Sequence, residues 1–128
     1  MTGSLRWRVA AAIWAALIVV SGVAPLGSVV EAIGPPDPVT TTGHFGAYAV
    51  FGFILVVALG GWRVSARALA VAFALAVALG AVVELIQGPI PYRDASLVDL
   101  AVDVAGAAVG LAVFSAVARG RRSRSRPG

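Results

Sequence analysis

The chain has 128 residues, of which 59% are hydrophobic and 12% charged, and its mean hydropathy is +0.93. A soluble domain of this size carries roughly twice that charged fraction, and the apolar residues here stand in long runs, which indicates an integral membrane protein. The net charge of +4 comes from ten arginines placed beside apolar runs and in a short tail, so membrane topology explains it better than nucleic-acid binding does. The absence of Cys excludes disulfides, thiolate metal sites and lipidated cysteine.

The first apolar run, "VAAAIWAALIVVSGVA", begins after "RWR" and predicts a first span over about 7–29, with Pro25 bending its outer end. A signal peptide is the alternative interpretation, because a basic start precedes an apolar middle and small residues at Gly22 and Ala24. Pro25 would directly follow the cut and is a poor cleavage context, so we expect a retained helix.

The segment "EAIGPPDPVTTTG" is rich in proline and predicts a loop over 31–43, with Thr41 or Thr42 as N-cap of a second span at about 43–62. A tight connection then leads to a third span at about 66–87. Two prolines in "GPIPYRDAS" prevent the helix from continuing, and a fourth span follows at about 97–118. Residues 119–128, "RGRRSRSRPG", predict a disordered basic tail that contacts anionic headgroups.

The predicted fold is therefore all-α, an integral membrane four-helix bundle over residues 1–118. With four spans, both termini share one side with the turn between spans two and three. That side collects nine of the ten arginines, all but Arg93, which predicts cytoplasmic termini in the cell membrane. The acidic residues and the only histidine, His44, then lie in outer loops or at the outer ends of helices.

Helical spacing places the polar residues on three narrow stripes. His44 and Tyr48 are four residues apart on the second span, and Glu84 and Gln87 are three apart on the third. On the fourth span, a single face carries Asp99, Asp103, Gly106 and Gly110. All three stripes begin at the outer membrane boundary, so three helices are able to present polar side chains to one shared point.

Asp103 is the most informative of these residues, since it sits ~6 Å deeper than Asp99. An Asp at the centre of a membrane helix costs ~2.5–3.5 kcal/mol, so Asp103 needs a partner, a proton or water. Arg93 is the expected counter-ion and His44 the next candidate. The alternative is a structural hydrogen bond from a protonated Asp103 to a neighbouring helix.

Several roles stay open for the remaining groups. Glu84 fits a general base, a metal ligand or an interfacial charge, whereas Asp94 fits a solvated loop charge. His44 with the outer acids supplies enough donors for a divalent cation, but no metal motif such as HExxH is present, so the expectation is no cofactor. Gly106 and Gly110 form a small-xxx-small pair, which predicts close helix packing or an oligomer.

The motifs "GHFGAYAVFGF" and "ELIQGPIPYRDASLVDLAVDVAGAAVG" resemble the VanZ-like family of small membrane proteins. The resemblance covers about residues 43–114. Its matching residues are His44, Tyr48, Glu84, Gln87, Arg93, Asp99, Gly106 and Gly110. The family pattern has Asn at the position of Asp103, so the site here is more acidic. The resemblance implies an envelope role of the glycopeptide-resistance kind and supplies no settled reaction.

The leading hypothesis is an outward-facing site that acts on or binds a lipid-linked or glycan component of the envelope. In a catalytic version, His44 and Glu84 are candidate bases with Asp99 as a further catalytic residue, while the substrate contacts are Tyr48, Gln87, Arg93 and Asp103. Whether the protein is an enzyme stays open. A small transporter or proton-coupled subunit, or a purely structural subunit of a membrane complex, is the alternative.

Overall fold

Five helices make up the computed structural model, which describes residues 2–34 and 36–124. They are α1 (Thr2–Val23), α2 (Gly27–Ile33), α3 (Pro36–Gly60), α4 (Ala66–Gln87) and α5 (Leu97–Arg124), and the described residues contain no strand. Four of them are long and apolar enough to cross a membrane, over Ser4–Val23, Val39–Gly60, Ala66–Gln87 and Leu97–Arg124. The prediction of an all-α protein with four membrane spans is confirmed.

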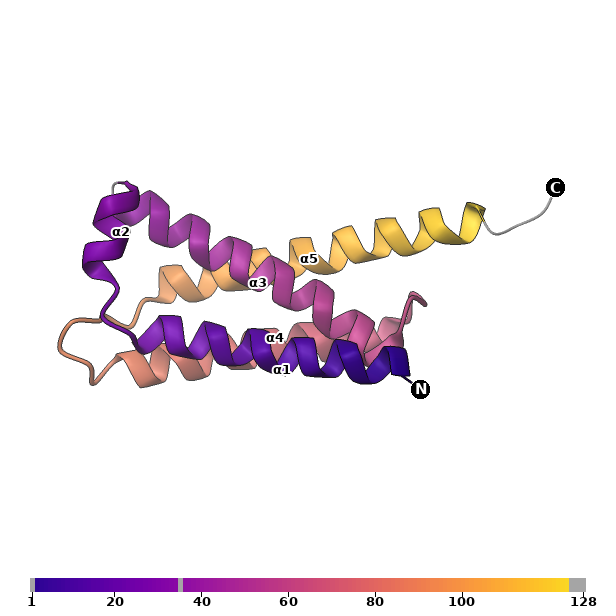
Figure 1. Ribbon diagram of the computed structural model, residues 1–128, viewed down its shortest axis with the longest axis horizontal. Coiled ribbons are helices and arrows are strands. Elements are labelled where there is room, and N and C mark those ends of the chain that lie inside the picture. Colours follow the sequence, from indigo (N-terminus) through magenta and orange to yellow (C-terminus); the bar gives the residue numbers. More distant parts are fainter. Residues whose placement is uncertain (1, 35, 125–128) are drawn as a thin grey trace.

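The four long helices run lengthwise through the molecule, and the short α2 lies across one end (Figure 1). The connection between α4 and α5 lies at that same end. The N-terminus, the turn between α3 and α4, and the last turns of α5 lie at the opposite end. Helix α3 is central, since it packs against each of the other four helices and most extensively against α5.

The predicted first span was too long at its outer end. Helix α1 ends at Val23 rather than near residue 29, and α2 begins separately at Gly27. Pro25 causes the break, because proline has no N–H to donate and its ring collides with the carbonyl oxygen four residues earlier, that of Ser21. The break exposes the last carbonyl groups of α1 to partners from elsewhere in the chain.

The predicted loop at 31–43 and the predicted disordered tail were also wrong in part. Helix α3 begins at Pro36, so Thr41 and Thr42 lie inside it and cap nothing; a proline suits the first turn of a helix, where its missing N–H is not needed. Helix α5 continues to Arg124, since Arg is a good helix former and favours the negative C-terminal end. Residues 125–128 of the tail lie outside the described residues.

Small residues allow α5 to lie directly against α3. A Cβ atom added at Gly106 would collide with the carbonyl oxygen of Phe45, and one added at Gly110 with that of Ala49. The predicted small-xxx-small stripe therefore packs against a helix of the same chain. Oligomer formation stays a prediction, and this buried stripe does not supply its interface.

Aromatic side chains join the helices at the end of the bundle where α1 begins and α5 ends. The ring of Trp62 stacks on Phe114 with centroids 6.1 Å apart and meets the edges of Trp7 and Phe53, each at 6.0 Å. The guanidinium carbon of Arg121 lies 4.4 Å above the same indole ring. Trp62 thus joins α1, α3 and α5 at one point. This contact fixes the relative positions of the three helices at the end of the bundle opposite α2.

Candidate functional site

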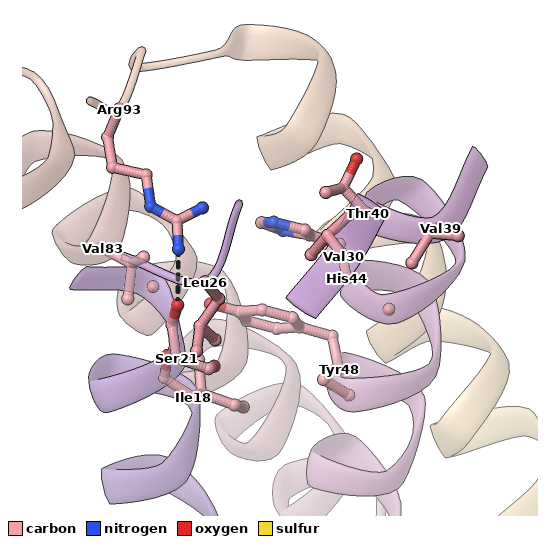
Figure 2. A pocket seen from close by; sticks show the side chains of 13 residues that line it. Ile18, Ser21, Leu26, Val30, Val39, Thr40, His44, Tyr48, Val83 and Arg93 are labelled. Atoms are coloured by element: carbon pink, nitrogen blue, oxygen red, sulfur yellow. Dashed lines mark hydrogen bonds between the residues drawn. The ribbon is translucent and has the colours of Figure 1, made fainter. Parts of the chain in front are cut away.

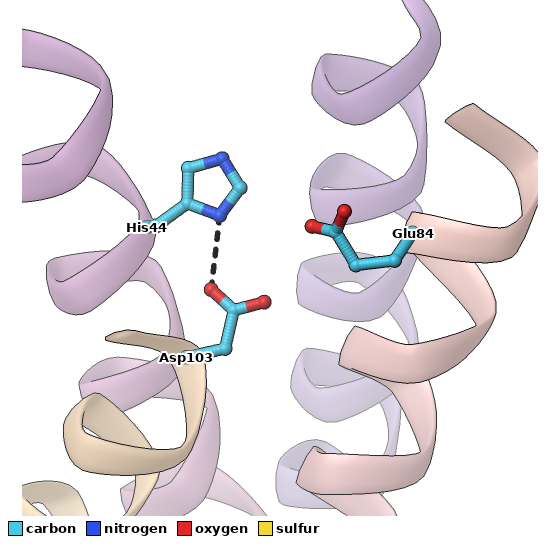
Figure 3. A group of neighbouring side chains, drawn as sticks. All are labelled: His44, Glu84 and Asp103. Atoms are coloured by element: carbon cyan, nitrogen blue, oxygen red, sulfur yellow. Dashed lines mark hydrogen bonds and ion pairs between the residues drawn. The ribbon is translucent and has the colours of Figure 1, made fainter. Parts of the chain in front are cut away.

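Three of the predicted site residues meet near the α2 end of the bundle (Figure 3). His44 comes from α3, Glu84 from α4 and Asp103 from α5, and one donor atom from each lies within 4.8 Å of the other two. The Nδ1 atom of His44 lies 2.9 Å from Oδ1 of Asp103, which is a hydrogen bond and an ion pair when the imidazole is protonated. The helical stripes inferred from spacing thus face one another.

Both carboxyl groups are buried: Asp103 is 1% exposed and Glu84 is 7% exposed. Glu84 accepts a 2.6 Å hydrogen bond at Oε2 from the backbone N–H of Ser96. Within the described chain, the buried side-chain atoms without a hydrogen-bond partner are Glu84 Oε1, Asp103 Oδ2 and the hydroxyl of Tyr48, which is 2% exposed. Such atoms are costly in a low-dielectric interior unless they gain a partner.

Glycines on two helices make room for this cluster. A Cβ added at Gly80 of α4 would lie 3.1 Å from Oδ2 of Asp103, so the missing side chain gives the carboxyl group its space. Gly106 lies one turn after Asp103 on the same face, and its contact with Phe45 draws α5 toward the turn of α3 that carries His44. Sequence patterning predicts which face of its helix each residue lies on. The distance between the side chains is set by the close backbone contact between the helices.

Asp99 is not one of the three residues whose donor atoms meet, but it lies close enough to interact electrostatically with all of them. It lies half-buried in the first turn of α5, where its backbone N–H donates to Oγ of Ser96 at 3.2 Å. Ser96 thereby caps α5 and, through its own N–H, holds Glu84. Sequence reasoning missed Ser96, although Ser96 followed by Asp99 three residues later matches the N-terminal capping pattern and would have revealed it.

Three side chains from the end of α4 and the next turn hold the broken end of α1. Gln87 donates to the carbonyl oxygen of Gly22 at 2.9 Å, and Tyr92 donates to that of Val23 at 3.1 Å. Arg93 donates through Nη2 to Ser21 at 2.9 Å and to Ala24 at 2.6 Å. These carbonyl groups lack helical donors because the helix stops at Pro25.

Arg93 is therefore not the counter-ion of Asp103, contrary to the sequence-based expectation; His44, the second candidate, takes that place. The physical reason is that a guanidinium group is favoured at the carbonyl end of a helix, where the helix dipole is negative. Nothing in the spacing of Tyr92 within the sequence predicts its hydrogen bond to α1.

A cavity of about 260 Å³ lies beside the cluster, between α1, α2 and α3 (Figure 2). In the figure, the guanidinium group of Arg93 and the imidazole of His44 face each other across it, and the ring of Tyr48 lies below them. Most of its other lining residues are apolar or small: Ile18, Gly22, Leu26, Val30, Val39, Gly43, Ala47 and Val83. The arrangement suits an amphiphile whose polar end is an anion.

The VanZ/LLP1 family model matches residues 7–118, most of the chain. The chain belongs to the VanZ/LLP1 family. Neither the comparison with curated proteins nor that with solved structures gave a match. This result confirms the family that the motifs predicted, and with the four apolar helices it makes the chain a multi-pass VanZ/LLP1 membrane protein.

The residues that carried the resemblance to the VanZ/LLP1 family fall into groups in space. The hydroxyl of Tyr48 lies near the carboxyl groups of the His44, Glu84 and Asp103 cluster. Gln87 and Arg93 hold the end of α1, and the two glycines of α5 pack on α3. The family motif thus combines one polar cluster with the contacts that position it.

Proposed function

We propose that this VanZ/LLP1 protein binds the anionic headgroup of a lipid-linked cell-envelope component in the cavity between α1, α2 and α3. The observation that supports this most directly is the pair of Arg93 and His44 facing each other across an otherwise apolar cavity. A guanidinium group binds phosphate or carboxylate oxygens, and apolar walls accept a hydrocarbon chain.

The proposal places the cavity at the outer face of the cytoplasmic membrane. The cavity lies at the end of the bundle opposite the termini. Arginines accumulate at the end with the termini, and arginine-rich ends of membrane helices stay in the cytoplasm. The ligand would therefore be a component exposed on the outer leaflet.

Chemistry on this headgroup would use the neighbouring cluster. The hydrogen bond to Asp103 orients the imidazole of His44, as the orienting carboxylate does for a general base, and Glu84 is the second candidate base. Gln87 would act by holding α1 as one wall of the cavity, whereas Arg93 would both hold α1 and bind the headgroup.

A transport function has less support from the packing. Among the described residues, the buried polar side chains Glu84, Gln87 and Asp103 lie toward the cavity end. The other buried residues of α4 and α5 are Ala68, Ala72, Ala76, Gly80, Val83, Gly106, Ala107, Gly110, Phe114 and Ala118. A path for ions or protons would also need buried polar groups in the half of α4 and α5 that lies away from the cavity.

Two glycines of α3 provide a matched test. A Cβ at Gly43 or at Gly46 meets nothing within 4 Å, yet only Gly43 lines the cavity. We expect Gly43→Leu to fill the cavity and to reduce binding of a polyprenyl phosphate at least ~10-fold, whereas Gly46→Leu retains it. Native mass spectrometry of the protein in detergent measures both, with the uncharged polyprenol as the control ligand.

Equal binding by the two variants would place the ligand elsewhere. Equal binding of the phosphate and the uncharged polyprenol would remove the role assigned to Arg93 and His44.

A further inference from the structure

We propose that His44, Glu84 and Asp103 bind a divalent transition-metal ion, Zn²⁺ or Mn²⁺, with the hydroxyl of Tyr48 facing the same ion. The inference goes beyond the proposed function, because ion binding needs no envelope ligand and is measured without one. It rests on the spacing of the donors, on three unpartnered buried atoms and on the charge of the cluster.

The donor atoms have nearly the spacing that a metal ion imposes. Two ligands each about 2.1 Å from a tetrahedral zinc ion lie about 3.4 Å apart. In the cluster, His44 Nδ1 and Asp103 Oδ1 are 2.9 Å apart, and the three donor atoms all lie within 4.8 Å of one another. These distances lie on either side of the ideal value, so small rotations of the side chains would bring the donor atoms toward the spacing of metal ligands.

The atoms without partners identify where the ion would be held. Glu84 Oε1, Asp103 Oδ2 and the hydroxyl of Tyr48 are buried, and none of them has a hydrogen-bond partner of good geometry within the described part of the chain. They come from three different helices, and the hydroxyl of Tyr48 lies close enough to both carboxyl groups to interact with them electrostatically. One ion bound here would give partners to these oxygen atoms on three helices. Figure 3 shows the two carboxyl groups among them, those of Glu84 and Asp103.

The charge of the cluster also favours a dication. Two carboxylates on membrane-spanning helices are expensive together, and a protonated His44 neutralises only one of them. A divalent ion with a neutral imidazole neutralises both. The guanidinium group of Arg93 is bonded to the carbonyl groups of α1 instead.

The donor types select among metals. Ca²⁺ and Mg²⁺ take oxygen ligands almost entirely, while an imidazole nitrogen suits Zn²⁺ and its first-row neighbours. Carboxylates extend the choice to Mn²⁺. A set of one imidazole and two carboxylates therefore predicts Zn²⁺ or Mn²⁺ over Ca²⁺ and Mg²⁺.

The test uses the full chain, purified in detergent, stripped with a chelator and dialysed against each metal. We expect about one Zn²⁺ or Mn²⁺ per chain by elemental mass spectrometry, and a rise of ~5 °C in the unfolding midpoint. Asp103→Asn and Glu84→Gln keep the side-chain volumes and should each weaken binding at least ~100-fold, because each removes a charged ligand. Asp94→Asn removes an exposed loop carboxylate and should bind as the wild type does.

Circular dichroism of each metal-free variant checks that it is folded, and Mn²⁺ electron paramagnetic resonance reports ligation independently of stability. Substoichiometric binding by the wild type, or unchanged affinity in both cluster variants, overturns the proposal. Tighter binding of Ca²⁺ than of Zn²⁺ removes His44 from the site. Polyprenyl phosphate binding is measured separately with Gly43→Leu, and Arg93 takes no part in the ion site, so failure of one proposal is distinguishable from failure of the other.

Discussion

Gln87 is only 3% exposed, and its side chain donates to the carbonyl oxygen of Gly22, which Pro25 and the end of α1 leave without a helical donor. We predict that Gln87→Met, which keeps the volume and removes the donor, lowers the free energy of unfolding by about 1–2 kcal/mol, since a buried acceptor is left unsatisfied. Tryptophan fluorescence during denaturation in detergent measures this change.

Tyr92→Phe is the matched comparison, because it also removes a donor to an α1 carbonyl group, but at a side chain that is 58% exposed. Water or headgroups replace the lost bond there, so we expect a change of about 0.5 kcal/mol or less. Equal losses in the two variants would show that burial of Gln87 does not set the cost.

Residue spacing predicted which polar side chains share a face, and the meeting of His44, Glu84 and Asp103 lies on those faces. Spacing did not predict which of these side chains form hydrogen bonds or ion pairs with one another. Opposite charge predicted that Arg93 would pair with Asp103. Arg93 instead binds carbonyl groups that have no helical N–H donor, because Pro25 ends α1 early. A partner created by a break in another helix leaves no trace in local spacing.

At the scale of helices, the approach of α5 to α3 depends on the absence of side chains. We predict that Gly110→Ala destabilises the protein by about 2–3 kcal/mol, because the added methyl group would overlap the backbone oxygen of Ala49, which has no rotamer to escape into. Thermal unfolding in detergent, with the elution volume from size exclusion as a check on assembly, measures the effect.

Gly120→Ala is the control on the same helix, since a Cβ at Gly120 meets nothing within 4 Å. There we expect a gain of about 0.5–1 kcal/mol from the better helix propensity of Ala. A Gly110→Ala protein as stable as the wild type would mean that α3 and α5 are less closely packed than these contacts require.

The ends of a helix could be predicted from sequence where the local residues allow only one interpretation. Helix α4 spans Ala66–Gln87, the range that was predicted, because Ser65 caps one end and two prolines follow the other. The N-terminal half was harder, since prolines near residues 25 and 36 allow either a bend, a break or a helix start. Tertiary contacts at α1 and α3 decide between these outcomes, and no pattern within the segment records them.

At the scale of the whole molecule, the two ends of the bundle differ in charge. The aromatic cluster around Trp62 marks the end with both termini, where eight of the nine arginines of the described chain lie. Arg93, the cavity and the acidic cluster mark the other. The function proposed above requires the cavity end to face outward, so membrane orientation is the property that most directly limits it.

The absence of native cysteine allows that orientation to be measured with single substitutions. We predict that Asp94→Cys, in the exposed loop at the cavity end, reacts in intact cells with a membrane-impermeant maleimide. Ser123→Cys, exposed near the end of α5, should react only after the membrane is permeabilised, because arginine-rich ends of membrane helices favour the cytoplasmic side. Neither change alters an arginine, so the charge asymmetry that sets the orientation is preserved. Labelling of Ser123→Cys alone in intact cells would reverse the topology and place the cavity at the inner leaflet, where only cytoplasmic lipid precursors can reach it.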